Sequence, residues 1–393
     1  MQQQSEKLDN FDGDDRMSET VGRRIKQARK ALGLSLEDLA AQVGISIGQL
    51  SKMENGKVTP SVPSLARLGL QMKRPIAYFL QTDADIPRSL ATIVPAWDTE
   101  AQALRRFAEL VNEQTAGALS ISVFSESQIG PGTSQVDGLI NGLIDIYAES
   151  LAFFGKHVDA IRPLSLPFFF DGEQHQQIFV SSKLFENEIR RPLLKLRVEL
   201  LPVSWRRGPT IVMISKEPLW SPHDLRGRKI RCPNLEVWTR FFTLLGAQPV
   251  LVQWPDVEAS FIRGDFDAMI TNLSYVINMR LTRIARYVSL LNYRPTDLNF
   301  AMHLQRYRML LPPLQQAVIN AAEVAGQVCS QLLDATNDQI ATVCEQDNAI
   351  FSTVPSGPWR EQSRKAIIEI ERRKFWRKGL YAEIQALAAT NPQ

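Results

Sequence analysis

Residues 35–60, SLEDLAAQVGISIGQLSKMENGKVTP, form the stretch that decides how the N-terminal part of the chain folds. Apolar residues recur in it at helical spacing and predict one seam shared by two short helices: Leu39, Ala40, Val43, Ile45 and Leu50. Gly44 stands between these helices, where a tight turn favours a residue without a Cβ atom. Ser35 is a good N-cap for the first helix, and Asp38 follows at the spacing of a capping box. The stretch therefore predicts two helices joined by a turn, the second with polar side chains suited to reading DNA.

The positive charge of the chain is concentrated in the same region. The whole chain has a net charge of +3. Residues 17–80 carry ten Lys/Arg and four Asp/Glu, whereas residues 1–16 are acidic and the rest of the chain is neutral in sum. Such a distribution is expected of a phosphate-binding module attached to a neutral domain, and the alternative is a solvated helix surface. Together with the two-helix pattern it favours DNA binding.

Length and composition predict a soluble protein of two or three domains. The chain has 393 residues, of which 44% are hydrophobic and 22% are charged. It contains no run of 18 or more apolar residues, so we expect no membrane partner. The N-terminal stretch MQQQSEKLDNFDGDDRM lacks the basic start and apolar core of a secretory signal, which favours a cytoplasmic protein.

Cysteines and histidines give no indication of a metal site. The three cysteines, Cys232, Cys329 and Cys344, are far apart and lack metal-ligand spacing, and the four histidines are scattered. We therefore expect reduced cytosolic thiols and no cofactor.

Hydrophobic periodicity and the positions of proline predict a disordered N-terminal arm, two domains and a linker between the domains. Residues 1–16 are expected to be disordered, and residues 17–81 to form a small all-α domain of five helices, the last opening at Pro75. Residues 82–95 hold two prolines and are expected to form a linker. Residues 96–393 alternate between helix-like and strand-like segments, which is typical of an α/β domain with mostly parallel strands.

The small domain resembles the lambda-repressor-like (XRE-type) helix-turn-helix family over about residues 18–80. The resemblance depends on Arg24 with Ile25, on the runs LGLSLEDLA and VGIS, and on Leu50–Ser51 followed by MENG at 53–56. It implies that the third helix lies in the major groove of operator DNA, with its first turn facing the base edges. Because one such module seldom binds tightly alone, we also expect a homodimer on two half-sites.

The same resemblance assigns DNA contacts to eight residues of this segment. They are Ser35, Ser46, Ile47, Gly48, Gln49, Lys52, Asn55 and Lys57. Gln49 and Lys52 are suited to base edges and Ile47 to a thymine methyl group, whereas Asn55 and Lys57 would approach phosphate. The chain departs from the family at Leu36, where members often have a glutamine that contacts the DNA backbone; Ser35 or Lys57 would then provide that contact. Two alternatives stay open, a solvated surface for Lys52 and packing on a neighbouring helix for Ile47.

The remainder of the chain resembles the substrate-binding proteins of tripartite ATP-independent periplasmic (TRAP) transporters over about residues 100–350. The matching segments follow one another in the family's order: TAGALSISVF, SQIGPGTSQVDGLINGLIDI, LSLPFFF at 164–170, SPHDLRGRKIRCP at 221–233 and GAQPVLVQWPDVEASFIRGDFDA at 246–268. The resemblance implies a two-lobed domain, like a periplasmic binding protein, whose cleft closes around a small organic acid.

Arg231, in the segment KIR, matches the arginine with which that family binds a carboxylate. A planar guanidinium suits this role because it donates two parallel, charge-assisted hydrogen bonds. The alternative for Arg231 is a surface ion pair. A second family arginine follows the glycine that matches Gly208, but here Arg206 and Arg207 precede that glycine instead.

Further ligand contacts are expected from polar residues near strand ends and from aromatic residues. The family's asparagine contact falls at Thr271, with Asn272 adjacent, and Glu149 and Ser150 follow a predicted strand. Four aromatic residues are candidates for the cleft wall, with core packing as the alternative for each: Phe170, Trp205, Trp238 and Trp254.

These observations favour a ligand-responsive transcriptional regulator with a small all-α helix-turn-helix domain followed by a two-lobed α/β domain. Its expected partners are double-stranded operator DNA, a small organic acid and a second copy of the chain. The alternative is an enzyme acting on a small carboxylate, although we find no nucleophile–base pair, phosphate loop or metal-ligand cluster in the sequence. A transporter receptor fits neither the polar N-terminus nor the DNA-reading segment.

Overall fold

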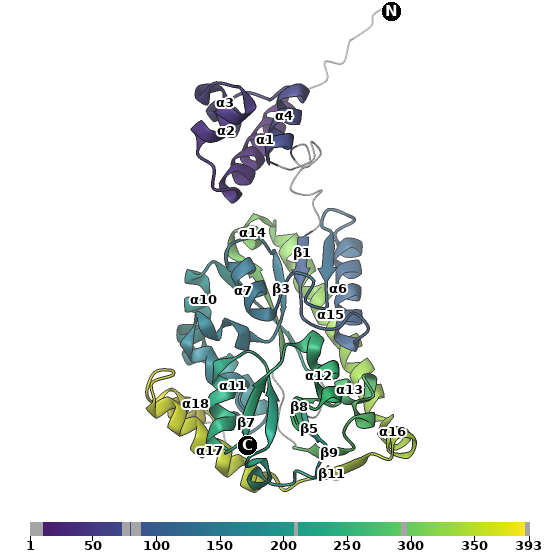
Figure 1. Cartoon of the computed structure of the whole chain (residues 1–393). Helices are drawn as coiled ribbons and strands as arrows, with labels where there is room; N and C mark the ends of the chain where they lie inside the picture. The colour runs from purple at the N-terminus through teal and green to yellow at the C-terminus, as the bar shows by residue number, and fades with distance from the viewer. Residues whose placement is uncertain (1–10, 73–78, 80–87, 208–210, 292–296, 390–393) are drawn as a thin grey trace, which may run out of the picture. The chain divides into compact units, whose positions relative to one another are not determined.

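The computed structural model describes residues 11–72, 79, 88–207, 211–291 and 297–389 (Figure 1). The chain forms two compact units, one of Met1–Pro87 with Ala118–Ser120 and the other of Arg88–Gly117 with Ile121–Gln393. None of the described helices combines the length and the hydrophobicity needed to cross a membrane.

The first unit is a helical domain. Its described helices are α1 (Phe11–Ala31), α2 (Leu36–Val43), α3 (Ile47–Glu54) and α4 (Val62–Met72). Four of the five expected helices are thus present, and the one expected to open at Pro75 lies outside the described residues. Residues 11–16, expected to be disordered, belong to α1, whereas residues 1–10 of the expected arm are not described.

The turn between α2 and α3 has the predicted chemistry. Gly44 ends α2 in the left-handed conformation, with φ of 71°, which a residue without a Cβ atom adopts most readily. The Ser35 hydroxyl accepts a hydrogen bond from the Asp38 amide at 3.0 Å, and the Asp38 carboxylate accepts one from the Ser35 amide at 2.9 Å. This reciprocal capping box fixes where α2 begins.

The second unit is an α/β domain built on two sheets. The first sheet has the strand order β2-β1-β3-β10-β4 and the second β11-β9-β5-β8-β6-β7. The strands of the first sheet are β1 (Arg88–Ala91), β2 (Ile121–Phe124), β3 (Ile146–Glu149), β4 (Val198–Trp205) and β10 (Leu298–His303). Those of the second are β5 (Ile211–Ser215), β6 (Lys229–Cys232), β7 (Gln248–Leu251), β8 (Ala268–Asn272), β9 (Tyr287–Leu290) and β11 (Ile350–Thr353).

Helices cover both sheets of this domain. They are α6 (Thr99–Gln114), α7 (Gly132–Ile140), α8 (Glu173–Val180), α9 (Lys183–Phe185), α10 (Arg191–Lys195), α11 (Glu236–Leu244), α12 (Val257–Arg263), α13 (Leu273–Asn278), α14 (Leu304–Met309), α15 (Pro312–Asn337), α16 (Ile340–Asp347), α17 (Ser356–Arg372) and α18 (Leu380–Ala389). Short helical turns complete the chain: η1 (Leu151–Lys156), η2 (Asp159–Ser165), η3 (Glu186–Arg190), η4 (Pro222–Leu225), η5 (Trp254–Asp256) and η6 (Leu281–Arg283). The long helix α15 packs along α6 beside the first sheet and also contacts α13 of the second (Figure 1).

The chain passes between the two sheets more than once, which gives the domain two lobes. It leaves the first sheet after β4 and returns to it at β10, and both β5 and β10 run antiparallel to their neighbours. The expectation of mostly parallel strands holds narrowly, since five of the nine pairings between described strands are parallel. The linker expected over residues 82–95 is wrong for residues 88–91, because these pair with β2 and β3 as the strand β1.

Candidate functional site

The residues expected to contact DNA lie on α3 and at its two ends, except for Ser35, which caps α2. All eight expected residues, Ser35, Ser46, Ile47, Gly48, Gln49, Lys52, Asn55 and Lys57, are exposed. Ser46 also caps α3, since its hydroxyl accepts a hydrogen bond from the Gln49 amide at 3.1 Å. Ile47 is 46% exposed, so it does not pack on a neighbouring helix of this domain. Lys52 and Lys57 have no carboxylate within 4.0 Å in the described part of the chain, which leaves both ammonium groups available to DNA.

A buried ion pair holds the C-terminal end of α3 against α1. The guanidinium of Arg29 donates to both carboxylate oxygens of Glu54, at 2.6 and 2.8 Å, and also to the Leu34 carbonyl at 2.8 Å. The helices approach so closely that a Cβ atom on Gly22 would lie 2.1 Å from the Met53 carbonyl oxygen. The MENG segment thus has a structural role that its sequence did not reveal, because Glu54 fixes the helix that presents Gln49.

A cavity of about 170 Å³ opens between the two lobes of the second unit. Residues from strands β3, β6 and β8 and from the segment after β4 line it. It contains seven of the residues expected from the sequence: Glu149, Ser150, Arg231, Trp238, Trp254, Thr271 and Asn272. Because β6 and β8 are parallel neighbours, their C-terminal ends meet at one edge of the sheet and bring Arg231 and Thr271 together.

Arg231 is a buried cation in the wall of this cavity. Its Nε atom donates to the Val252 carbonyl at 3.0 Å, and its guanidinium lies 5.3 Å from the centroid of the Trp254 ring. No carboxylate lies within 4.0 Å of it in the described residues. Burial lowers the pKa of Arg231 to about 10, so the group remains protonated at neutral pH. The surface ion pair considered from the sequence is therefore wrong, since Arg231 is only 8% exposed.

Arg207 is a second arginine in the same cavity, and it is neutralised. Its Nη1 atom lies 2.5 Å from Oε1 of Glu149, and its Nη2 atom lies 3.0 Å from Oε2 of Glu100. The sequence gave a partial indication, because two arginines precede Gly208. The structure places only Arg207 in the cavity, whereas Arg206 is exposed and lies 3.9 Å from Glu173.

Three buried carboxyl groups, those of Asp98, Glu100 and Glu149, surround the single guanidinium of Arg207. Burial raises the pKa of Glu100 to about 8 and that of Asp98 to about 6, although Arg207 acts in the opposite direction on both. Oε2 of Glu149 and Nε of Arg207 are buried without a hydrogen-bond partner in the structure. Buried polar atoms are nearly always paired, so these two atoms mark a place that a polar ligand or water would satisfy.

Tyr275 completes the aromatic wall of the cavity and was not expected from the sequence. Its ring lies 4.7 Å from the ring of Trp254, measured between centroids. Both rings line the cavity beside Arg231. Nothing in the sequence singled out Tyr275, because it lies on α13 and looks like one more apolar helix position.

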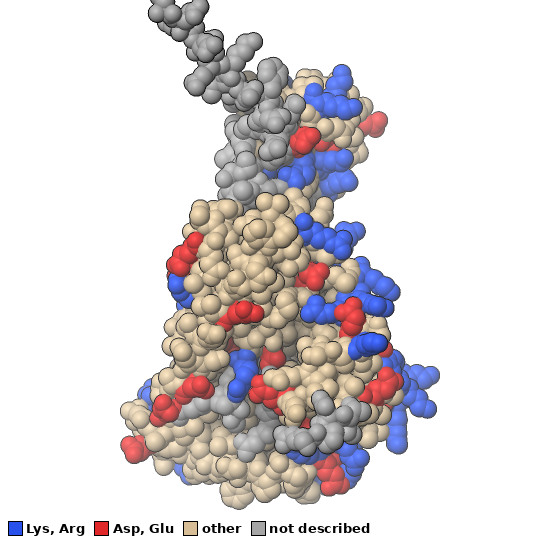
Figure 2. All heavy atoms as spheres, turned by 180° about the vertical axis from the view of Figure 1, so that it is seen from behind, with Lys and Arg blue, Asp and Glu red and all other residues tan. Residues whose placement is uncertain are grey.

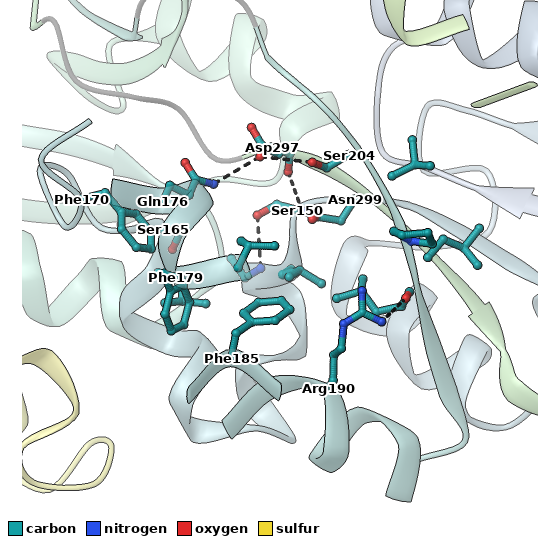
Figure 3. A pocket seen from close by; sticks show the side chains of 18 residues that line it. Ser150, Ser165, Phe170, Gln176, Phe179, Phe185, Arg190, Ser204, Asp297 and Asn299 are labelled. Atoms are coloured by element: carbon teal, nitrogen blue, oxygen red, sulfur yellow. Dashed lines mark hydrogen bonds between the residues drawn. The ribbon is translucent and has the colours of Figure 1, made fainter. Parts of the chain in front are cut away.

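A second cavity, of about 200 Å³, lies in the first lobe (Figure 3). It shares Ser150 and Ser165 with the cavity that contains Arg231, but its walls are mainly apolar. Phe170 points into this second cavity and does not line the first, so its expected place beside Arg231 is wrong. Gln176 donates to Asp297 at 3.2 Å across the rim.

Trp205 is a core residue and not a wall of the Arg231 cavity. Its indole nitrogen donates to the Ala322 carbonyl of α15 at 2.7 Å, and its ring lies 4.9 Å from that of Phe300, measured between centroids. Trp205 is the last residue of β4 and is only 3% exposed. Arg207 lies two residues further along, beyond the end of β4, and its side chain lines the cavity.

Comparisons with known proteins identify both units. The family model of the bacterial extracellular solute-binding proteins, family 7, matches residues 90–376, and a helix-turn-helix model matches residues 25–79. An uncharacterized protein of Haemophilus influenzae is 25% identical over 295 residues, covering 73% of this chain and 88% of the relative. The 2,3-diketo-L-gulonate-binding periplasmic protein of Escherichia coli is 24% identical over 243 residues, covering 62% of this chain and 74% of the relative.

Solved structures share the fold of the larger unit. A TRAP periplasmic solute binding protein from Xanthobacter autotrophicus with bound β-D-galacturonate has a TM-score of 0.66 at 21% identity, covering 77% of this chain and 99% of its own. One from Roseobacter denitrificans with bound L-galactonate has a TM-score of 0.67 at 19% identity, covering 77% and 98%. These matches confirm the predicted fold class, a helix-turn-helix domain followed by a two-lobed α/β domain.

Proposed function

Because the chain belongs to family 7 of the bacterial extracellular solute-binding proteins and also carries a helix-turn-helix, we propose that it is a ligand-responsive transcriptional regulator. In this proposal α3 binds operator DNA and the cavity between the lobes senses a small organic acid. The protein acts in the cytoplasm, where its operator is, and as a homodimer, because two half-sites need two copies of α3.

The observation that supports acid binding most strongly is the contrast between the two arginines of one cavity. Arg207 has two carboxylate partners, whereas Arg231 has none in the described residues. Leaving a charge buried and unpaired is costly, and a ligand carboxylate removes that cost. With Nε bound to the Val252 carbonyl, the terminal nitrogens of Arg231 are left for the ligand.

The polar groups around Arg231 favour an acid that also carries hydroxyl groups. Oε2 of Glu149 lacks a hydrogen-bond donor, and the side chains of Thr271 and Asn272 line the same cavity. Hydroxyl groups both donate and accept, so a hydroxy acid or sugar acid would match these side chains. Relatives are named for, or contain, such molecules: 2,3-diketo-L-gulonate, β-D-galacturonate and L-galactonate.

Lobe closure gives a route from acid binding to a response. The cavity is lined by Glu149 of the first sheet and by Arg231 and Thr271 of the second, so an acid bound there links the lobes. A closed form that binds the acid better is populated when the acid is present. DNA binding responds only if the open and closed forms differ in DNA affinity, and the coupling is then reciprocal.

A thermal-shift screen of the full chain tests this proposal. The panel contains D-galacturonate, D-glucuronate, L-galactonate, 2,3-diketo-L-gulonate and succinate, with the corresponding neutral sugars as controls. A ligand that binds only the native state raises the melting temperature, so we expect a rise with at least one hydroxy acid and none with neutral sugars. The active acid should also change the affinity of the chain for its operator. An acid that binds tightly and leaves operator affinity unchanged would contradict the regulatory role.

We further propose that the acid is bound and released unchanged, because the relatives and solved structures above are named as binding proteins. Prolonged incubation of the acid with the full chain, followed by NMR of the acid, should return the starting compound. Turnover that disappears in Arg231→Ala would instead favour an enzyme.

A further inference from the structure

Basic side chains gather where β4 begins and β10 ends. Residues 183–199 and 303–308 contain seven Lys/Arg and three Glu, in a domain that is neutral in sum. The two segments are neighbours, because the Leu304 amide at the start of α14 donates to the Arg197 carbonyl at 2.7 Å. Figure 2 shows Lys and Arg side chains along one edge of this domain, and Figure 1 places α10 and α14 at that edge.

Four of these seven cations have no carboxylate within 4.0 Å in the described residues: Lys183, Lys195, Arg197 and Arg308, all of them exposed. The other three are paired: Arg190 lies 4.0 Å from Glu199, Arg191 lies 3.6 Å from Glu186, and Arg306 lies 3.4 Å from Asp145. Burial raises the pKa of the Glu199 carboxyl, and Arg308 acts on it in the opposite direction. We call Lys195, Arg197 and Arg308 the free basic cluster.

The free basic cluster lies close to the point where the chain enters this domain. Arg88, the first residue of β1, lies 3.9 Å from Asp145, which also pairs with Arg306 on α14. Phe79 belongs to the core of the helix-turn-helix domain.

We propose that the free basic cluster binds DNA phosphates. The partner is DNA and not another polyanion because the cluster is tethered to a DNA-reading domain and is otherwise part of a neutral domain. Lys and Arg on such a surface add affinity without sequence preference. The inference rests on the DNA binding proposed above but not on the identity of the acid.

This surface would also connect DNA to the acid cavity through one strand. Arg197 immediately precedes β4, and Arg207 follows the last residue of β4 by two positions. β4 pairs with β10 at both of its ends, with a shift of register between them. Lobe closure that shifts β4 would therefore move the cluster against the phosphates, which supplies the differential DNA affinity that a regulator needs.

The test measures binding of the full chain to a 40-base-pair random-sequence duplex by fluorescence anisotropy between 50 and 300 mM NaCl. The test variant is Lys195→Gln/Arg197→Gln/Arg308→Gln. The matched control is Arg226→Gln/Arg364→Gln/Lys378→Gln, which removes the same charge from three exposed residues, one just after η4, one in α17 and one in the segment before α18. Circular dichroism checks that both variants are folded.

Each lost phosphate contact lowers the slope of log affinity against log salt by about 0.9. The test variant should therefore lose about 2 to 3 in slope, whereas the control should keep the wild-type slope. Equal slopes in all three proteins, or equal losses in both variants, would overturn the proposal. Binding to phosphatidylglycerol vesicles that only the test variant loses, with DNA binding unchanged, would overturn it in favour of a membrane surface. If no acid in the thermal-shift screen stabilises the chain, the expected salt slopes stay the same, because they do not depend on acid binding.

Discussion

The Nη1 atom of Arg207 lies 2.5 Å from Oε1 of Glu149, in the wall of the cavity that Arg231 also lines. One cavity therefore holds a neutralised guanidinium and an uncompensated one. A ligand carboxylate entering it meets net attraction at Arg231 and a satisfied ion pair at Arg207. This asymmetry sets the orientation in which we expect an acid to bind.

Arg231→Ala should abolish acid binding and leave DNA binding largely intact. Truncating one partner of a buried charge pair costs about 2–5 kcal/mol, so the dissociation constant should rise at least about 30-fold. Isothermal titration calorimetry with the acid found in the screen measures this. Arg231→Lys should fall between wild type and Ala, because an ammonium lacks the planar fork. Arg206→Ala is the control, since Arg206 is exposed and outside the cavity, and unchanged affinity in Arg231→Ala would refute the assignment.

Gln49→Ala should reduce discrimination between operator and random DNA. A bidentate contact to a base edge contributes about 1–3 kcal/mol of discrimination, which is lost only on the correct sequence. Lys57→Ala should instead weaken binding to both DNAs equally and lower the salt slope by about 1. Competition anisotropy with both duplexes separates the two effects. An equal loss on both DNAs in Gln49→Ala would mark that residue as a phosphate contact.

Glu54→Leu should destabilise the helix-turn-helix domain. It leaves the Arg29 guanidinium buried without its partner, which costs about 3–5 kcal/mol. The double variant Arg29→Met/Glu54→Leu should recover part of this loss, because no unpaired charge remains. Hydrogen exchange of α1 and α3 is the suitable measurement, since all seven tryptophans lie beyond residue 96 and report only on the other domain. Glu37→Gln, which changes an exposed carboxylate on α2, is the control and should show the same hydrogen exchange of α1 and α3 as wild type.

The larger domain should lose stability as the pH rises from about 4.5 to 8. Burial raises the pKa of Glu100 to about 8, so in this interval the folded state holds a proton that the unfolded state releases. Stability is then greatest below the unfolded pKa and falls as the pH approaches the folded one. We expect a fall of at least about 1.4 kcal/mol, the value of one pKa unit. Urea unfolding followed by tryptophan fluorescence measures it.

Glu100→Gln should flatten this pH dependence, because the amide does not titrate. Glu258→Gln, an exposed carboxylate on α12, is the matched control and should keep the wild-type slope. A pH profile of Glu100→Gln that matches wild type would show that another group is responsible. Asp98, whose pKa burial raises to about 6, is the next candidate.

The sequence by itself determined the features that depend on neighbouring residues. The capping box of Ser35 and Asp38 and the turn at Gly44 follow from local backbone chemistry, and the structure confirms them. Arg231 was singled out by the resemblance of its KIR segment to the family's carboxylate-binding arginine, and the structure places it on β6 in the wall of the cavity. Local preference failed at residues 88–91, where a proline-containing stretch was expected to be a linker, because strand pairing with β2 and β3 decides that conformation.

Only the tertiary structure decided which charges are paired and which are free. Arg29 with Glu54, and Arg207 with Glu100 and Glu149, are ion pairs between residues far apart in sequence. Whether an arginine binds a ligand depends on the carboxylates that folding brings within a few ångströms of it. Burial and electrostatic compensation are properties of the packed molecule and not of the local sequence. For this reason only the tertiary structure shows that Trp205 lies in the core and that Arg231 lines the cavity.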